Sequence, residues 1–269
     1  MSAYNIYLES FSLPAMGAKV GYPYNVLEPK ELNEIEFAPI TIFYGGNGSG
    51  KSTLLNIIAR KLCVQMLDRG NDAETLLPFI KACTYTVTAP FNNHCDIPAD
   101  SRFIRSEEVM HGIIKTRRHN EKVKEHIHNA NPELYERFFD NPDGNPGYIW
   151  SYDRWIYRAL ENYSEARSNG ELAFDYFQGN ITEGTLVLLD EPENSLSPKF
   201  QNELAKMISD YARFFRCQFI IATHSPFLLS IKGARIYDLD TIPAQVRPWT
   251  ELESIKIYAD LFKGLFDER

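Results

Sequence analysis

A glycine-rich stretch near residue 45 has the residue types and spacing needed to bind a phosphate chain. The pattern Gly45-x4-Gly50-Lys51-Ser52 follows an apolar run at 40–43 and precedes an apolar helical pattern. Backbone N–H groups can converge on phosphate only where side chains leave room, and a following helix N-terminus adds donors. We expect Lys51 to reach the β- and γ-phosphates and Ser52 to place its hydroxyl on Mg²⁺. The predicted nucleotide site comprises Gly45, Gly46, Asn47, Gly48, Ser49, Gly50, Lys51, Ser52 and Thr53.

Two carboxylates at the end of a second apolar run are candidates for metal binding and general base catalysis. Residues 186–189 are all apolar, and Asp190 and Glu191 follow directly. Charges are rarely left unpaired at such a buried position. We therefore expect Asp190 to lie on the Mg²⁺ side of the nucleotide and Glu191 to orient or deprotonate the attacking water. His224, near the carboxyl end of a strand pattern at 218–225, is a candidate sensor of the γ-phosphate, and a structural role is the alternative.

The elements that must position these residues are parallel strands, because ligands of such sheets bind beyond the carboxyl ends of the strands. The sequence predicts an α/β fold with a P-loop nucleotide-binding core, a mostly parallel central sheet and N-terminal antiparallel strands. Strands are expected at 4–12, 35–37, 40–44, 84–88, 103–105, 186–190, 218–225, 236–239 and 246–247. Helices are expected at 51–67, 198–215 and 250–266.

The segment from 107 to 180 differs from the rest of the chain. It is polar and helical in pattern, and it is interrupted by a loop signal at 141–147. We predict one domain spanning 1–269, in which 1–106 and 181–269 form the α/β core and 107–180 is an inserted helical lobe. Lysines and arginines between His111 and His128 could contact an acidic partner such as nucleic acid. A solvated helix face is the simpler interpretation, because glutamates lie among these cations.

Composition narrows the classes of protein to consider. The chain has 269 residues, of which 44% are hydrophobic and 24% are charged, and its formal net charge is −8. This balance is typical of a soluble globular protein and argues against a surface that is basic throughout. The sequence has no apolar run long enough for a membrane span and no secretory pattern. Its four scattered cysteines favour reduced thiols, so we expect a cytoplasmic protein.

The order of the motifs resembles that of ABC-type ATPases. Asp190-Glu191 followed by His224 resembles the Walker B and switch-histidine pair of that class, and Ser168-Asn169-Gly170-Glu171 resembles its signature motif. Leu189-Asp190-Glu191-Pro192-Glu193 and Ile220-Ile221-Ala222-Thr223-His224-Ser225-Pro226 are most similar to stand-alone bacterial ATPases of the "AAA family", on the SMC-, RecF- and OLD-like side of the class.

The resemblance implies an ATPase that uses ATP and Mg²⁺ and forms a homodimer when ATP binds. In such a dimer, Ser168 and Gly170 would complete the nucleotide site of the other subunit, and Asn194–Ser197 would cross the interface. Transporter ATPases place a glutamine at the lobe junction, and Glu107 is the candidate substitute here on the metal side. Hydrolysis would then drive a switch or motor that acts on a nucleic-acid or protein partner.

Two alternative functions, and the residue that stacks on adenine, stay open at this stage. The chain could be the ATP-binding subunit of a membrane transporter, although the missing glutamine argues against a permease partner. It could instead be a nucleotide-dependent binding module with little turnover. For the adenine base, Tyr22 or Tyr24 is a candidate stacking residue, but ordinary packing of a loop tyrosine is equally compatible with the sequence.

Overall fold

A mostly parallel sheet forms the centre of the computed structural model, which describes residues 6–15, 21–67, 73–88, 97–136 and 168–267. Within these residues the sheet has six strands in the order β5-β6-β7-β3-β8-β9. Its first five strands run parallel, and β9 pairs antiparallel with β8. The strands are β3 (Ile40–Tyr44), β5 (Arg102–Arg105), β6 (Leu186–Asp190), β7 (Gln218–Ala222), β8 (Arg235–Asp238) and β9 (Gln245–Val246).

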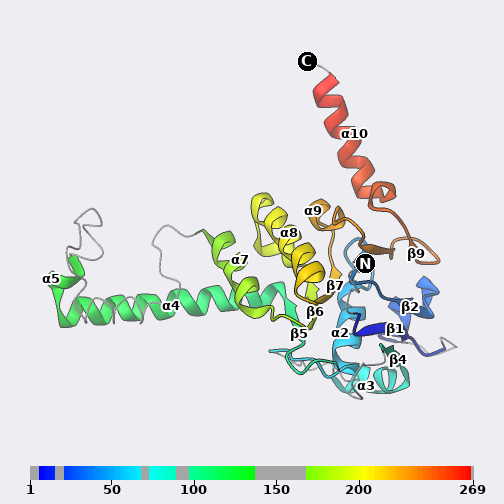
Figure 1. The fold of residues 1–269 in the computed structure, drawn as a ribbon, viewed down its shortest axis with the longest axis horizontal. Helices are drawn as coiled ribbons and strands as arrows, with labels where there is room; N and C mark the ends of the chain where they lie inside the picture. Colours follow the sequence, from blue (N-terminus) through cyan, green and yellow to red (C-terminus); the bar gives the residue numbers. More distant parts are fainter. Residues whose placement is uncertain (1–5, 16–20, 68–72, 89–96, 137–167, 268–269) are drawn as a thin grey trace.

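A smaller antiparallel sheet lies beside the central one (Figure 1). In the described part of the chain it has three strands in the order β2-β1-β4, namely β1 (Leu8–Ser12), β2 (Glu34–Glu36) and β4 (Thr84–Val87). The buried side chain of Gln218 ties the two sheets together, because its Oε1 accepts hydrogen bonds from the backbone N–H groups of Tyr7 and Leu8, both at 2.9 Å. The predicted fold class, a mostly parallel sheet with N-terminal antiparallel strands, is confirmed.

Helices cover both faces of the central sheet, while two helices extend beyond it. Figure 1 shows α4 and α10 projecting away from the body of the protein. The helices are α1 (Tyr24–Leu27), α2 (Lys51–Lys61), α3 (Ala73–Ala82), α4 (Ser106–Ala130), α5 (Pro132–Tyr135), α7 (Asn169–Asn180), α8 (Pro198–Phe214), α9 (Pro226–Leu229) and α10 (Glu253–Asp267). Short 3₁₀ turns are η1 (Glu28–Lys30), η3 (Pro192–Ser195) and η4 (Trp249–Glu251).

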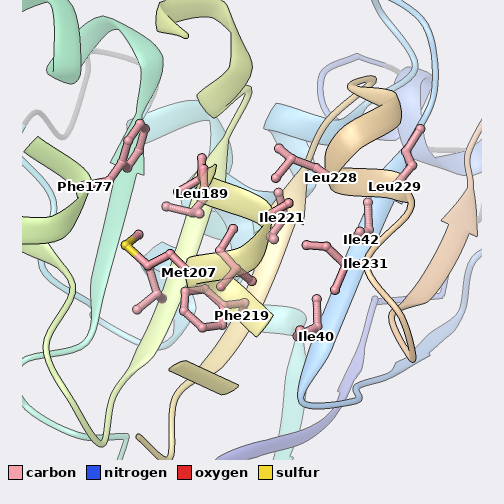
Figure 2. Close-up of a cluster of buried hydrophobic side chains, with 14 of the residues drawn as sticks. Ile40, Ile42, Phe177, Leu189, Met207, Phe219, Ile221, Leu228, Leu229 and Ile231 are labelled. Atoms are coloured by element: carbon pink, nitrogen blue, oxygen red, sulfur yellow. The ribbon is translucent and has the colours of Figure 1, made fainter. Parts of the chain in front are cut away.

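The hydrophobic core is split into two clusters by the sheet. Alternate residues of a strand point to opposite faces, so Ile42 and Leu189 belong to one cluster and Phe43 and Leu188 to the other. The first cluster packs against α4, α7, α8 and α9, and Figure 2 shows part of it. The second packs against α2, α3 and the antiparallel sheet. Burial on both faces explains why these strands read as continuous apolar runs.

Helix α2 is shorter than predicted. It ends at Lys61 and not at residue 67, because Cys63 adopts a left-handed conformation with φ of 55° and turns the chain. Gln65 then forms a parallel bridge with Arg102, and its backbone hydrogen bonds to Ser101 and Phe103 hold the chain against the edge near β5. Tertiary pairing therefore overrides a helical sequence pattern over the last residues.

The predicted inserted lobe is described only in part. Its first helix, α4, begins at Ser106, and its last described helix, α7, packs against α4 and α8. The predicted loop at 141–147 lies outside the described residues. The division of the chain into an α/β core and a 107–180 lobe therefore stays a prediction.

Candidate functional site

The glycine-rich stretch forms the loop between β3 and α2, at the carboxyl end of a central strand. Gly48 and Gly50 have φ of 80° and 100°, which only glycine adopts readily, and Gly50 is the N-cap of α2. A Cβ at Gly45 would lie 2.5 Å from the hydroxyl of Ser49, so the loop closes too tightly for any side chain there. A pocket against this loop is lined by Val26, Asn47, Gly48, Ser49, Gly50, Lys51, Ser52, Thr53 and Glu191.

Lys51 lies inside the loop and is nearly fully buried. Its ammonium donates to the carbonyl oxygens of Gly45, at 2.8 Å, and Gly46, at 3.0 Å. The same nitrogen lies 3.5 Å from a carboxylate oxygen of Glu191. The cation is thus held at the centre of the loop, next to the loop N–H groups that a phosphate chain would meet.

Asp190 and Ser52 come together at the point predicted for the metal. The Ser52 hydroxyl donates to Asp190 Oδ1 at 2.9 Å, although the two residues lie on different elements, α2 and β6. Burial raises the pKa of Asp190 to about 6, while the Ser52 hydrogen bond and Lys51 oppose the shift and the neighbouring Glu191 and Glu107 add to it. A cation at this position would favour the ionised carboxylate.

The residues present fit a Mg²⁺ ion shared with phosphate oxygens better than they fit a metal ion bound only by protein ligands. Mg²⁺ binds hard oxygen ligands and usually takes one or two carboxylates together with phosphate oxygens and water. In the described part of the chain, no three histidine, cysteine, aspartate or glutamate side chains gather into a metal-binding cluster. The site instead offers a hydroxyl, from Ser52, and a carboxylate, from Asp190, in one pocket with Glu107. That donor set needs phosphate oxygens to complete it.

Glu191 occupies a strained position directly after β6. Its φ of 47° is left-handed, which is uncommon for a residue other than glycine and often marks a functional site. Its carboxylate is about one quarter exposed and is held by Asn194, whose Nδ2 donates at 2.9 Å, and by Lys51 on the other side. Glu191 lines all three pockets around the loop, so its carboxylate is accessible to solvent from each of them.

His224 lies at the carboxyl end of β7 and is positioned by Glu193, a residue whose role was missed in the sequence. One carboxylate oxygen of Glu193 accepts from the Thr223 hydroxyl at 2.6 Å and from the His224 backbone N–H at 2.8 Å. The same oxygen lies 3.3 Å from His224 Nδ1. This contact orients the ring and leaves Nε2 as the imidazole nitrogen that has no contact with Glu193.

Asp240 is a second site residue that sequence reasoning missed. Both of its carboxylate oxygens lie within hydrogen-bond distance of the Gly46 N–H, at 3.0 and 2.9 Å. It lines a pocket with Glu191 and His224. Its position after a predicted strand could have identified it from the sequence. Asp240 follows β8, a parallel neighbour of β3, so it lies at the same edge of the sheet as the phosphate loop.

Ser168 and Gly170 lie at the start of α7, away from the loop. The Ser168 hydroxyl accepts from the Glu171 N–H at 3.3 Å and forms a capping box with it. A Cβ at Gly170 would lie 2.9 Å from the ring of Phe200, so glycine lets α7 approach α8. Neither residue lines the three described pockets around the loop, so their predicted part in a nucleotide site needs a second copy of the chain.

The two tyrosines considered for adenine stacking differ in position. The hydroxyl of Tyr22 donates to Thr53 Oγ1 at 3.2 Å, and its partly exposed ring lines the pocket that also contains Ser52 and Asp190. Tyr24 packs edge-on against Phe79 with ring centroids 5.0 Å apart. Tyr24 therefore serves the hydrophobic core, and Tyr22 is the one of the two that lies at the phosphate loop.

Solved structures that match this chain include SMC heads and an ABC cassette. An SMC head bound to the C-winged helix domain of ScpA is 15% identical with a TM-score of 0.46, covering 90% of this chain and 97% of its own. The SMC head domain from Thermotoga maritima is 14% identical with a TM-score of 0.43, covering 90% and 98%. A dimeric bacterial ABC transporter cassette is 12% identical with a TM-score of 0.44, covering 91% and 99%. No curated protein matches the chain.

One family model matches the part of the chain that contains Glu191 and His224, two of the catalytic candidates. Residues 177–230 match the family described as "AAA domain, putative AbiEii toxin, Type IV TA system". The matched segment includes Asp190, Glu191 and His224 together with Glu193. The resemblance to AAA-family ATPases is confirmed over this segment. The phosphate loop at 45–53 and the motif at 168–171 lie outside it.

Proposed function

We propose that this chain binds Mg-ATP and hydrolyses it. The observation that carries the proposal is the meeting of Ser52 with Asp190 at 2.9 Å, beside the Lys51–Glu191 pair at 3.5 Å. Two of these four residues open α2 directly after the loop, and the other two stand at the end of β6. Their charges and donors suit a triphosphate, a divalent cation and a water molecule in adjacent positions.

Each residue has a separate role in the proposed reaction. The backbone N–H groups of 45–53 and the Lys51 ammonium bind the phosphates, and Ser52 and Asp190 supply oxygens to Mg²⁺. The cation, when bound, neutralises charge on the phosphate oxygens. Glu191 accepts a proton from the water molecule while the water oxygen forms a bond to the γ-phosphorus. The bond between the γ-phosphorus and the β-phosphate oxygen breaks, and ADP is released. His224 contacts the γ-phosphate through Nε2.

A second copy of the chain would complete the site. The start of α7 offers a helix N-terminus and the exposed residue Ser168, whose N–H and hydroxyl donate to the Glu171 carboxylate, and these groups lie outside the pockets around the chain's own loop. A phosphate of the other subunit's nucleotide would take the place of that carboxylate. ATP bound between two copies would hold them together, and hydrolysis would release them. In this proposal the protein is a nucleotide-controlled switch. Glu107, near the start of α4, lies on the metal side of the nucleotide site.

Two substitutions test the proposal. Lys51→Ala should weaken ATP binding at least tenfold, because it removes the only cation inside the described loop. Glu191→Gln should leave ATP affinity within about threefold and slow hydrolysis by about 100-fold or more, as expected for loss of a general base. Binding is measured by calorimetry and turnover by phosphate release. Glu183→Gln, an exposed carboxylate far from the loop in sequence, is the matched control.

The same measurements distinguish the alternatives. Normal turnover by Glu191→Gln would contradict the assigned base, whereas ATP binding without turnover in the unmodified protein would favour a binding module. If the chain were instead the ATP-binding subunit of a transporter, its partner would be a membrane permease. Across the described residues, no helix combines the length and apolar character needed to cross a bilayer.

Helix α4 favours nucleic acid as a second functional candidate. His111, Lys115, Arg118 and Lys122 recur at three- and four-residue spacing, so they lie along one side of the helix, and all are exposed. Lys115, Arg118 and Lys122 are cations, and a line of three cations suits a phosphate backbone even though the whole chain is acidic. Duplex DNA should then stimulate ATP turnover in low salt and lose affinity as salt rises. Equal turnover with and without DNA would point to a protein partner.

A further inference from the structure

The peptide group between Gly45 and Gly46 is held by charged side chains at both of its polar ends. Its N–H faces Asp240, whose two carboxylate oxygens lie 3.0 and 2.9 Å from the Gly46 nitrogen. Its carbonyl oxygen, that of Gly45, accepts a hydrogen bond of 2.8 Å from the Lys51 ammonium. A carboxylate and an ammonium group therefore bind opposite ends of one peptide group at the start of the phosphate loop.

A peptide group couples the contacts at its two ends. Because the group is planar, fixing the direction of its N–H also fixes the direction of its C=O. A hydrogen bond to a charged acceptor also polarises the group, which makes its carbonyl oxygen a stronger acceptor. Lys51 is only 4% exposed, and its ammonium donates to the Gly46 carbonyl as well, at 3.0 Å. The position of this buried cation thus depends on a peptide group that Asp240 orients.

The turn that carries Asp240 is fixed to the strand that precedes the loop. The Leu239 N–H donates to the carbonyl of Tyr44, the last residue of β3, at 2.8 Å. The Asp240 N–H donates at 3.0 Å to Oδ1 of Asp238, which is buried. The Lys30 ammonium donates to the carbonyl of Leu239. The backbone of this turn is therefore organised to present the Asp240 carboxylate to the loop.

Glycine leaves room for the carboxylate at the start of the loop. A Cβ at Gly45 would lie 3.0 Å from Asp240 Oδ1, in addition to its clash with Ser49. Asp240 and Gly46 are both exposed, whereas Lys51 is buried. Substitution of Asp240 should therefore change the contact with the loop without opening a cavity in the core.

We infer that Asp240 is a positioning residue, which holds the Lys51 ammonium in place through the Gly45–Gly46 peptide. The inference rests on the proposed function and deepens it, since Lys51 is the cation proposed to bind phosphate. A different role for the same carboxylate would be a gate that occupies the Gly46 N–H until a phosphate displaces it. The fixed turn favours positioning, because a gate has to move away from the loop.

Substitution of Asp240 separates positioning from gating. Asp240→Ala should weaken Mg-ATP binding about fivefold by calorimetry, as expected when one hydrogen bond that orients the cation is lost. Asp240→Asn keeps an acceptor oxygen and should stay within about twofold. Asp210→Ala, at an exposed aspartate of α8, is the matched control and should change nothing. Tighter binding by Asp240→Ala would assign the gate, and equal losses in the alanine and asparagine variants would also overturn the inference.

A double-mutant cycle tests whether Asp240 acts through Lys51. In the Lys51→Ala background, Asp240→Ala should change ATP affinity less than about twofold, because the ammonium that it positions is gone. The same loss in both backgrounds would show that the two residues act independently, and positioning would be wrong. Urea unfolding of each variant identifies a purely structural effect, which would lower stability and weaken binding in both backgrounds.

Hydrogen exchange tests the contact without any nucleotide. NMR of protein labelled with ¹⁵N only at its 15 glycines can follow the Gly46 N–H. Asp240→Ala should speed the exchange of this N–H at least fivefold, and Asp240→Asn less than about twofold, because the amide oxygen still accepts the hydrogen bond. Unchanged exchange in Asp240→Ala would overturn the inference, whatever the protein does with ATP.

The outcomes distinguish this inference from the proposed function. If Lys51→Ala weakens ATP binding and Asp240→Ala does not, the proposed role of Lys51 stands and the positioning role of Asp240 is wrong. If Gly46 exchange responds to Asp240→Ala but Lys51→Ala binds ATP normally, the contact exists and the proposed phosphate-binding role of Lys51 is wrong.

Discussion

At the residue scale, the site is organised by carboxylates whose neighbours give them different tasks. Asp190 is buried and bonded to a hydroxyl, and Glu191 is partly exposed and held between a cation and an amide. Glu193 is buried and accepts from the Thr223 hydroxyl and the His224 N–H. Three acidic residues within four positions thus divide into a candidate metal ligand, a candidate base and a positioning group. The three carboxylates differ in their proposed roles because they differ in burial and in hydrogen-bond partners, not in residue type.

Substitution of Glu193 tests the positioning role. Glu193→Ala would leave the buried Thr223 hydroxyl and the His224 N–H without their acceptor, so the free energy of unfolding should fall by about 1–3 kcal/mol. Glu193→Gln keeps an acceptor oxygen and should lose less than about 1 kcal/mol. Urea unfolding measures both effects.

The turnover of Glu193→Gln supplies the functional half of this test. We expect turnover to fall at least tenfold with ATP affinity nearly unchanged, because the amide holds the His224 ring less firmly than the carboxylate does. Equal losses of affinity and turnover would assign Glu193 a purely structural part. Glu183→Gln, exposed at the surface, should change neither quantity.

At the element scale, the start of the predicted lobe depends on close packing of α4 and α7. Gly112 of α4 faces the ring of Tyr176 of α7, and a Cβ there would lie 2.6 Å from Tyr176 Cε2. Gly170, in the first turn of α7, similarly faces Phe200 of α8. Because Ser168 caps α7, its position depends on these two contacts between helices.

A pair of glycine substitutions tests this packing. Gly112→Ala should lower the free energy of unfolding by about 1–3 kcal/mol, since the Tyr176 ring must move to admit the methyl group. Gly179→Ala, in α7 with no atom near the added Cβ, should instead raise it by up to about 1 kcal/mol through better helix propensity. Chemical denaturation measures both. Equal effects of the two substitutions would contradict the close contact at Gly112.

At the scale of the whole molecule, the central sheet joins the candidate nucleotide site to both hydrophobic clusters. Strands β3, β6 and β7 lie side by side and contribute residues to each cluster while their carboxyl ends carry the loop, Asp190 and His224. A ligand that binds across these strand ends therefore stabilises the packing of the whole core, not of one loop.

Thermal and chemical unfolding test this coupling. Mg-ATP at about one hundred times its Kd should raise the free energy of unfolding by about 2.7 kcal/mol through binding to the folded state alone. Lys51→Ala should show about half of that increase or less at the same ATP concentration. ATP with EDTA should also stabilise less, because Ser52 and Asp190 then lack the cation between them and the phosphates. The same stabilisation with and without Mg²⁺ would contradict the metal position.

The sequence by itself determined the strands, the loop and the order of the motifs, because local chemistry dictates them. A glycine-rich turn into a helix and a fully apolar strand ending in carboxylates are each compatible with few folds, and the fold class followed from them. The motif around Asp190, Glu191 and His224 could be read for the same reason, since its residues directly follow two apolar strands. The early end of α2 could not be predicted from the sequence, because it depends on the pairing of Gln65 with Arg102, which is distant in the chain.

Tertiary structure alone decided which side chains meet. Ser52 and Asp190 are separated by more than one hundred residues, and only the parallel register of β3, β7 and β6 brings their elements together. Asp240 joins the loop, and Glu193 turns toward His224, through contacts that no local pattern encodes. The exposed face of α10 is likewise a tertiary fact: its sequence predicts an amphipathic helix, and only the fold leaves its apolar side uncovered. Periodicity shows that a helix has an apolar face, whereas burial depends on what the rest of the chain places against it.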